Sequence, residues 1–391
     1  MMRTYRFLLR PTARQAAALA ACVEDHRQLY NAALAERREA YRRARVNVRY
    51  GDQSAQLKDI RRADPDQGRW SFSSQQATLR RLDKAFTAFF RRIKAGQRSG
   101  YPRFKGAGRF DSVQWPKDGD GCRWDSAPES GQTRVYLQGV GHIRVHAHRR
   151  VDGRVKTISI KREGRRWHVA LSCADVPTKP LTAIGSAVGI DMGVASFLTT
   201  SDGRKADNPR YLAASADRLA QAQRTLARRR RGSNRRRKAR EGVAALQAKL
   251  SRQRRDHAHK IALWLVRHYD FIAHEDLRIS NMTCSARGTI DVPGVNVAAK
   301  AGLNRSILDA SWGMFLAILS AKAESAGRTI IAVNPRNTSR TCPRCRHCAK
   351  ENRVTQADFR CVRCEFAAHA DVVGASNVLR ARLARQAASS A

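Results

Sequence analysis

The last fifty or so residues of the chain contain a regular set of cysteines. Two Cys-x-x-Cys pairs, Cys342/Cys345 and Cys361/Cys364, are separated by fifteen residues. Four thiolates at this spacing can close a tetrahedral shell around Zn²⁺, as in a small zinc ribbon. Because four sulfur ligands leave no open position for water, the sequence predicts one structural zinc ion here.

Other residues in the same stretch offer alternative zinc ligands. Cys348 lies three residues after Cys345, and His347 and His369 are also nearby. The symmetric quartet is the preferred prediction, because two Cys-x-x-Cys knuckles close a ribbon. The remaining explanations are a disulfide pair, which a reducing compartment disfavours, and free thiols.

Three acids occupy corresponding places along the chain. Asp191 and Glu275 each end a short apolar run that predicts a strand, and Asp371 opens a helix seven residues after the last cysteine. A carboxylate at the end of a strand in a mixed α/β sheet points into the crevice where ligands bind. Taken singly, each acid has a plainer explanation: a turn former, a surface acid and a helix N-cap, respectively.

Together the three acids have the chemistry of a divalent-metal site. Hard oxygen ligands suit Mg²⁺ or Mn²⁺. Two such ions about 4 Å apart activate water and stabilise the leaving oxygen when a phosphodiester is cleaved. We therefore expect two Mg²⁺ or Mn²⁺ ions at Asp191, Glu275 and Asp371, beside the zinc ribbon.

The charge of the chain indicates a polyanionic partner. Its 391 residues include 75 Lys plus Arg and 33 Asp plus Glu, which gives a net charge of +42. Such an excess destabilises a compact fold unless a polyanion neutralises it, and nucleic acid is the natural candidate. A genome rich in Arg codons would explain the arginines but not the shortage of acids.

Cysteine use and hydropathy indicate the compartment. Five of the nine cysteines fall between Cys342 and Cys364 and the rest are scattered, which favours a metal in a reducing environment over disulfides. The N-terminus has no apolar core of signal-peptide length, and no stretch approaches a membrane span. We expect a soluble cytoplasmic protein with no membrane partner.

The first half of the chain combines helices with strands. Alternation of Tyr5, Phe7 and Leu9 predicts a strand over Arg3–Leu9, and Thr12-x-x-Gln15 predicts a capping box at the start of a helix. A second helix is predicted after Ser73 or Ser74, with an apolar stripe from Leu79 to Ile93 as its core seam. Strands are then predicted at Arg134–Leu137, His142–Val145, Val155–Ile160 and Trp167–Ser172, as a small β-barrel or sandwich.

The second half, from Ser186, has the pattern of an α/β domain after a linker over Ala174–Ile184. Its expected helices and strands are Ala187–Asp191, Ala195–Thr200, Leu212–Leu226, Glu241–His268, Asp270–His274, Ser306–Ala326 and Thr329–Val333, with a last helix after Asp371. Arg228–Arg240 makes a basic turn between two of the helices. Such a hairpin suits a phosphate backbone, although a charge run can also be a solvated or disordered tract.

These motifs, in this order, resemble those of the TnpB proteins of bacterial insertion sequences, which are relatives of type V CRISPR effector nucleases. GIDMGVASFLTTSDG at Gly189–Gly203 and HEDL at His274–Leu277 are similar to the first two RuvC motifs, and Asp371 with Ala375 and Asn377 is similar to the third. RQLYNAAL, GYPRFKG and NRSILDASWG are weaker matches. The chain departs from the family at Val373, where Asn is usual, and at Arg346 and Glu365, where Gly is usual.

The resemblance implies an RNA-guided DNA endonuclease. Such proteins bind a guide RNA from the transposon end, recognise a short motif beside the target in double-stranded DNA, and cut with one RuvC site. Asp191, Glu275 and Asp371 would be its catalytic metal ligands. Two alternatives stay open: a non-cutting RNA-guided DNA-binding regulator, and a transposase that joins DNA strands, since the same acids support hydrolysis and strand transfer.

The resemblance also implies the fold, which is α/β and α+β multidomain. We expect a β-barrel-like wedge domain with an inserted helical recognition lobe, followed by a RuvC or ribonuclease-H-like nuclease domain with an inserted zinc ribbon. The expected limits are 1–10 and 99–180 for the wedge domain, 11–98 for the lobe, 186–337 and 369–384 for the nuclease domain, 338–368 for the ribbon and 385–391 for a tail.

Overall fold

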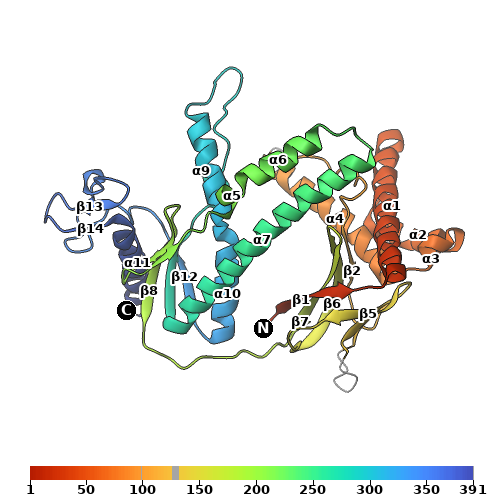
Figure 1. Ribbon diagram of the computed structural model, residues 1–391, viewed down its shortest axis with the longest axis horizontal. Coiled ribbons are helices and arrows are strands. Elements are labelled where there is room, and N and C mark those ends of the chain that lie inside the picture. The colour runs from red at the N-terminus through yellow and green to blue at the C-terminus, as the bar shows by residue number, and fades with distance from the viewer. Residues whose placement is uncertain (98, 126–131, 391) are drawn as a thin grey trace. The chain divides into compact units, whose positions relative to one another are not determined.

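The computed structural model describes residues 1–97, 99–125 and 132–390, with side chains as far as residue 381. The chain divides into two compact units, Met1–Pro177 and Thr178–Ala391. In Figure 1 the first unit runs from red to yellow and the second from yellow-green to blue. Among the described helices, none is both long enough and apolar enough to cross a bilayer.

The first unit contains one antiparallel seven-stranded sheet, in the order β2-β6-β7-β1-β5-β4-β3. The strands are β1 (Arg3–Arg10), β2 (Ser112–Trp115), β3 (Cys122–Asp125), β4 (Arg134–Leu137), β5 (Gly141–His146), β6 (Arg154–Glu163) and β7 (Arg166–Ala174). The predicted sandwich of two sheets is wrong. The single sheet curls so that β3 also contacts β6, but within the described residues its hydrogen bonding stops at β2 and β3, so no closed barrel forms.

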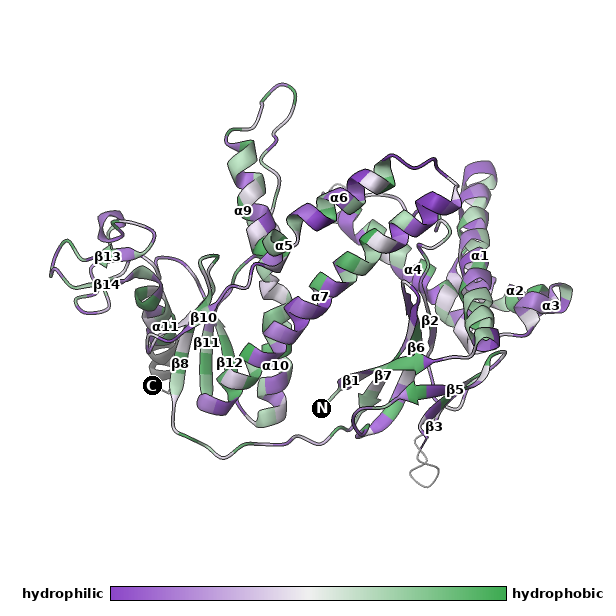
Figure 2. Cartoon of the chain, in the orientation of Figure 1, coloured by the Kyte–Doolittle hydropathy of each residue, from purple (hydrophilic) through white to green (hydrophobic). Residues whose placement is uncertain are grey.

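The first strand of the chain lies in the middle of this sheet, between β5 and β7. Its alternating Tyr5, Phe7 and Leu9 are all buried in the core of the unit, which confirms the strand predicted from that alternation. Figure 2 shows the resulting mixture of apolar and polar residues along the strands.

Four helices follow β1: α1 (Ala13–Ala44), α2 (Tyr50–Ala63), α3 (Pro65–Gly68) and α4 (Phe72–Lys94). The capping box of Thr12 and Gln15 at the start of α1 is confirmed. The predicted cap of α4 is wrong: Ser71 caps it by accepting a hydrogen bond from the Ser74 backbone. The apolar stripe of α4 is buried as far as Phe86, whereas Ile93 is 50% exposed, so the core seam is shorter than predicted.

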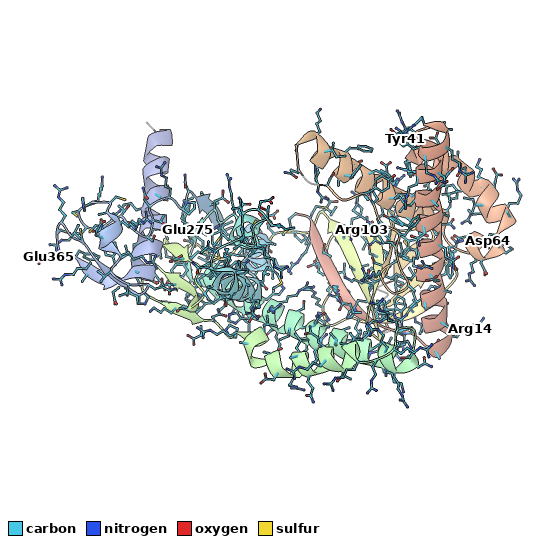
Figure 3. All side chains as sticks on the ribbon, turned by 90° about the horizontal axis from the view of Figure 1, so that it is seen from above. Arg14, Tyr41, Asp64, Arg103, Glu275 and Glu365 are labelled. Atoms are coloured by element: carbon cyan, nitrogen blue, oxygen red, sulfur yellow. The ribbon has the colours of Figure 1, made fainter. Side chains whose placement is uncertain are left out.

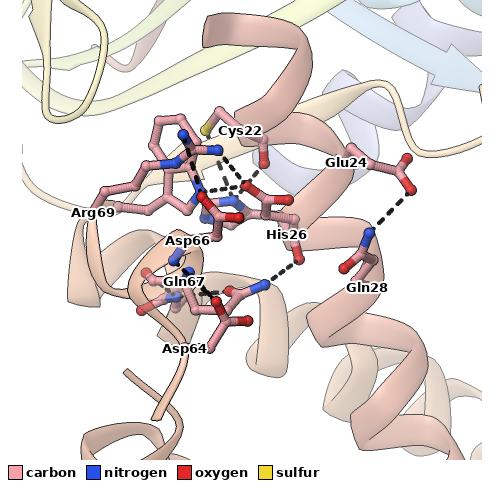
Figure 4. A network of polar contacts seen from close by, with 11 residues as sticks. Cys22, Glu24, His26, Gln28, Asp64, Asp66, Gln67 and Arg69 are labelled. Carbon is pink, nitrogen blue, oxygen red and sulfur yellow. Dashed lines mark hydrogen bonds and ion pairs between the residues drawn. The ribbon is translucent and has the colours of Figure 1, made fainter. Parts of the chain in front are cut away.

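A buried histidine of α1, His26 (labelled in Figure 4), contacts α4. His26 Nδ1 lies 2.7 Å from the Cys22 carbonyl oxygen, and Nε2 lies 2.8 Å from Ser74 Oγ. Complete burial lowers the pKa of His26 to about 4, so the ring is neutral at neutral pH. With Nδ1–H donating to the carbonyl and Nε2 accepting from the hydroxyl, both ring nitrogens are satisfied, and we assign His26 a structural role.

The second unit is built on a five-stranded mixed sheet, in the order β10-β9-β8-β11-β12. The strands are β8 (Ala187–Asp191), β9 (Ser196–Thr200), β10 (Lys205–Asp207), β11 (Phe271–Glu275) and β12 (Thr329–Val333). β8, β11 and β12 run parallel, and β9 and β10 are added antiparallel. The carboxyl ends of β8 and β11 therefore meet at one edge, where Asp191 and Glu275 are their last residues.

Seven helices complete the second unit: α5 (Tyr211–Ala214), α6 (Ala216–Ala227), α7 (Asn234–His268), α8 (Ile279–Met282), α9 (Val297–Ala310), α10 (Trp312–Ala326) and α11 (Ala370–Ser390), counted over the described residues. Side chains of α7 and α10 pack with Val188 and Ile272 of the sheet. Val378 of α11 packs instead with Ala273 and Val333. Since Ile272 and Ala273 point to opposite faces, the sheet is covered on both.

Several helix limits differ from the predictions. α7 begins at Asn234 rather than near Glu241, because Ser233 caps it and the basic residues that follow are already helical. The helix predicted over Ser306–Ala326 is two helices, with a break at Ser311, which has a φ of 58°. The helix predicted over Leu212–Leu226 is also interrupted, at Ser215. α11 continues to Ser390, so the tail predicted from 385 is helical; Ala391 lies outside the described residues.

The end of the predicted linker is fixed to the second unit. Arg328 donates to the Thr182 carbonyl at 2.9 Å, and the Asp270 carboxylate accepts the backbone N–H groups of Ile184 and Gly185. Lys179 N–H donates to the Ser325 carbonyl at 2.7 Å. Residues 179–185 thus belong structurally to the second unit.

Candidate metal centres

The four predicted cysteines come together between β12 and α11. Their sulfur atoms all lie within 4.8 Å of one another, and the pairs Cys342–Cys364 and Cys345–Cys361 are 3.6 Å and 3.5 Å apart. Tetrahedral Zn–S bonds of about 2.3 Å require sulfurs about 3.8 Å apart, so the quartet fits Zn²⁺, whereas an S–S bond would be about 2 Å. The alternative ligands Cys348, His347 and His369 do not belong to this group.

Two equivalent turns present the cysteines. In the first, Cys342 N–H donates to the His347 carbonyl; in the second, Cys361 N–H donates to the Phe366 carbonyl. Arg346 and Glu365 occupy the same place in these turns, with φ angles of 64° and 54°. Only Gly adopts this left-handed conformation without strain, which explains physically why Gly is favoured after a cysteine pair.

A buried amide connects the two turns. Asn352, which is fully buried, donates from Nδ2 to the Arg340 and His347 carbonyls at 2.8 Å and 3.1 Å. Its Oδ1 accepts the Val362 N–H at 3.0 Å. The strands β13 (Asp358–Arg360) and β14 (Ala367–His369) pair beside it. The ribbon is therefore held together by its own residues as well as by its sulfur cluster.

Asp191 and Glu275 are brought together by the register of two parallel strands. Ile190 of β8 is opposite His274 of β11, so the next residue of each strand is an acid at the same edge. Asp191 is the last residue of its strand rather than part of a turn, and Glu275 (labelled in Figure 3) is only partly exposed. The alternative explanations of a turn former and a surface acid do not fit these positions.

Asp371 reaches the same edge because α11 packs very closely on β8. A Cβ atom on Gly189 of β8 would lie 2.0 Å from the Ala375 carbonyl oxygen of α11. A Cβ atom on Gly374 would lie 3.0 Å from Asp191 Oδ2. Asp371 is the second residue of α11, one turn before Gly374, and is not its N-cap. Gly189 and Gly374 thus allow α11, which carries Asp371, to approach Asp191.

The charges of Glu275 and Asp371 both act on Asp191. Burial, followed by the negative charges of Glu275 and Asp371, raises the pKa of Asp191 to about 7. The pKa of Glu275 is also raised, chiefly by burial. Crowded, buried carboxylates repel one another unless a proton or a cation lies between them, so this arrangement favours binding of a divalent metal ion.

Arg353 of the ribbon also acts on this site, although no motif in the sequence points to it. Its positive charge lowers the pKa of both Asp191 and Glu275, against the effect of burial. Arg353 directly follows the buried Asn352, whose hydrogen bonds connect the two cysteine turns. No spacing rule for metal ligands selects an arginine, so only the folded chain reveals it.

The carboxylates are spread more widely than the sulfurs. Within the described part of the chain, the cysteine quartet is the group whose possible ligand atoms all lie within 4.8 Å of one another. A site for two ions about 4 Å apart needs acids on both sides of the pair and is wider than a single-ion shell. The donor set, oxygen only, fits Mg²⁺ or Mn²⁺ rather than zinc.

Comparison with known proteins identifies the family. A helix-turn-helix domain model matches residues 1–45, the OrfB_IS605 model, described as a probable transposase, matches 168–286, and a Cas12f1-like TNB domain model matches 312–378. The chain is 34% identical over 382 residues to the "Putative RNA-guided DNA endonuclease InsQ" of Escherichia coli (strain K12), covering 97% of this chain and 92% of the relative. The chain belongs to the TnpB family.

A second TnpB relative has a similar extent. The "Putative RNA-guided DNA endonuclease" of Streptomyces pristinaespiralis is 30% identical over 393 residues, covering 98% of this chain and 90% of that protein. The solved structure of the mini-RNA-guided endonuclease CRISPR-Cas_phi3 matches at 12% identity with a TM-score of 0.45, covering 98% of this chain and 92% of that one. We draw no structural conclusion from a TM-score this low. Residues 1–45 hold one strand and one long helix, not a helix-turn-helix.

Proposed function

We propose that this TnpB protein is an RNA-guided endonuclease that cuts double-stranded DNA beside a short flanking motif. The single observation that carries the proposal is the meeting of Asp191, Glu275 and Asp371 at one sheet edge, where burial and the charges of the other two acids raise the pKa of Asp191. The relatives named as RNA-guided DNA endonucleases, which match almost the whole chain, supply the substrate class.

The sheet supports a RuvC-like assignment. Three antiparallel strands followed by two parallel ones, in the order β10-β9-β8-β11-β12, are the arrangement of a ribonuclease-H-like sheet. Its first and fourth strands in chain order end in Asp191 and Glu275. The domain limits expected from the sequence, with a wedge domain and recognition lobe in the first unit, remain part of the proposal.

Each acid has a distinct role in the proposed reaction. Asp191, on which the charges of both Glu275 and Asp371 act, would be shared by two ions, while Glu275 and Asp371 would each hold one. Two Mg²⁺ or Mn²⁺ ions bound there would supply an activated water and neutralise charge on the leaving oxygen. Arg353 adds a fixed positive charge where a phosphodiester would enter.

The zinc ribbon would hold the acids and Arg353 in position and would not itself take part in the reaction. Its four sulfurs leave no coordination position for water or substrate. The basic turn between α6 and α7, coloured as hydrophilic in Figure 2, would contact a phosphate backbone of the guide RNA or the DNA.

The test begins with the protein expressed together with the DNA that flanks its gene. RNA that co-purifies is sequenced, and the complex is incubated with Mg²⁺ and a plasmid carrying the guide-matched target beside randomised flanks. We expect cutting that depends on the guide and is abolished in Asp191→Asn. Bound RNA and tight target binding without cutting by the wild type would support the regulator instead, and end joining without hydrolysis would support the transposase.

A further inference from the structure

The loop between β12 and the first zinc ligand reaches back to the acids. Thr338 in this loop is buried, at 7% exposure. Its Oγ1 lies 2.5 Å from Glu275 Oε1, although the two residues are 63 positions apart in the chain. Nothing in the sequence motifs gives this threonine a role, so the contact is a feature of the folded chain alone.

The hydroxyl of Thr338 has a single proton and two acceptors in reach. Glu275 Oε1 is at 2.5 Å and the Pro335 carbonyl oxygen at 2.9 Å. A hydrogen bond to an ionised carboxylate is shorter and about twice as strong as one to a neutral acceptor. The proton therefore goes to Glu275 whenever that acid is ionised. Oε1 is then fixed, and Oε2 is left to bind a metal ion.

The backbone of Thr338 is itself fixed by α11. Asn377, at 6% exposure, uses both hydrogens of its amide: Nδ2 donates to the Thr338 carbonyl at 2.7 Å and to the Thr341 carbonyl at 2.6 Å. Asn377 lies on the same helix as Asp371. Arg380, one turn further on, donates to the Pro343 carbonyl inside the first cysteine turn. Helix α11, which carries Asp371, thus also holds Thr338 and the first cysteine turn.

We propose that Thr338 is a positioning residue that sets the orientation of the Glu275 carboxylate for metal binding, and that Asn377 holds the backbone of Thr338 in place. The proposal rests on the divalent-metal site of the proposed function. The ribbon then has a second role besides its own folding, because it delivers a hydroxyl to an acid on a distant strand. Partners of this kind, behind the metal ligands, typically contribute about 10- to 100-fold to metal affinity or activity.

The central variant is Thr338→Val, which replaces the hydroxyl with a methyl group of similar shape and leaves the backbone bond to Asn377 in place. Thr338→Ser keeps the hydroxyl and should restore function. Thr355→Val is the matched control: Thr355 lies in the same ribbon, and its hydroxyl donates at 2.7 Å to the carboxylate of Asp358, which is not one of the three acids.

Two measurements are made on each variant. Mn²⁺ binding to the zinc-loaded protein without nucleic acid is followed by electron paramagnetic resonance, and cleavage of the guide-matched target is followed against Mg²⁺ concentration. For Thr338→Val we expect Mn²⁺ affinity to fall about 10- to 100-fold. We also expect the Mg²⁺ concentration for half-maximal cutting to rise by a similar factor, with zinc content and melting temperature close to wild type. Thr338→Ser and Thr355→Val should match the wild type.

The outcomes separate this inference from the proposed function. Unchanged Mn²⁺ binding and unchanged cutting in Thr338→Val would overturn the positioning role while leaving the nuclease intact. A loss of zinc in Thr338→Val would also overturn it, because the effect would then be one of folding. A wild type that binds Mn²⁺ but cuts no DNA would overturn the proposed function, and the Mn²⁺ comparison would still decide the role of Thr338.

Discussion

The four cysteines come from two tight turns fifteen residues apart, whereas Asp191 and Asp371 lie at opposite ends of the second unit's sequence. Each cysteine turn closes with its own backbone hydrogen bonds, and the whole ribbon lies between Thr338 and His369. The acids have no such local frame. They depend on strand register, on two glycines that admit α11, and on a threonine from the ribbon. The zinc site therefore tolerates residues other than Gly in its turns, whereas the acid site depends on packing between residues that are distant in the sequence.

The largest effect is expected from breaking the local site. Cys364→Ser removes one of four zinc ligands, and structural zinc contributes about 10 to 16 kcal/mol to the folding of small zinc domains. We expect loss of zinc, measured by elemental analysis, together with loss of solubility and of cutting. Cys348→Ser is the control, because that exposed thiol lies outside the quartet. Full zinc content and normal melting in Cys364→Ser would remove the zinc assignment.

The next effect tests the packing on which the distributed site depends. In Gly189→Ala the new Cβ atom would lie 2.0 Å from the Ala375 carbonyl oxygen, a backbone atom that cannot move aside without shifting α11. Overpacking of this kind costs about 1 to 3 kcal/mol or more. We expect a lower midpoint of urea unfolding and loss of cutting, with zinc retained. A variant with wild-type stability would contradict the close approach of β8 and α11.

A milder change should separate activity from stability. Gly374→Ala puts a Cβ atom 3.0 Å from Asp191 Oδ2, so the carboxylate must shift by a few tenths of an ångström. Cutting should fall at least tenfold, since displacement of a metal ligand weakens metal binding. The Gly302→Ala control adds a methyl group in α9 where nothing lies within 4 Å, and it should cut normally. Equal cutting by the two variants would show that cutting does not depend on the exact position of the Asp191 carboxylate.

The smallest effect concerns the strained residues of the zinc turns. Arg346→Gly and Glu365→Gly relieve the backbone strain at two positions with φ angles of 64° and 54°. We expect each to raise the free energy of unfolding by about 0.5 to 1 kcal/mol, because Gly adopts this conformation without steric cost. Arg363→Gly, at a neighbouring position without a positive φ, should instead destabilise the ribbon slightly. Destabilisation in all three would show that the turns do not require the left-handed conformation.

The features that the sequence predicted correctly are those with local causes. Cysteine spacing identified the quartet, and apolar runs located the strands that end in Asp191 and Glu275 to within a residue. Alternation of Tyr5, Phe7 and Leu9 located β1. Each depends only on residues close together in the chain, so spacing and periodicity are sufficient.

The features that could not be predicted from the sequence depend on residues that lie far apart in the chain or on helix ends that no pattern marks. Thr338 and Arg353 act on acids from strands far away in the chain, and no motif for metal ligands includes either residue type. The break at Ser311 and the early start of α7 at Asn234 were missed because neither apolar periodicity nor a charge run marks a helix end. The curl of the first sheet depends on contacts between β3 and β6 that alternation cannot report.

The most direct test of the central claim, one zinc site and one separate divalent-metal site, is a Mn²⁺ titration of the zinc-loaded protein without nucleic acid. The melting temperature and zinc content would be measured in the wild type and in Asp191→Asn. Mn²⁺ should raise the melting temperature of the wild type by relieving repulsion among Asp191, Glu275 and Asp371. It should have little effect on Asp191→Asn, and both proteins should keep one zinc ion. An equal Mn²⁺ response in the two proteins, or displacement of zinc by Mn²⁺, would contradict the account.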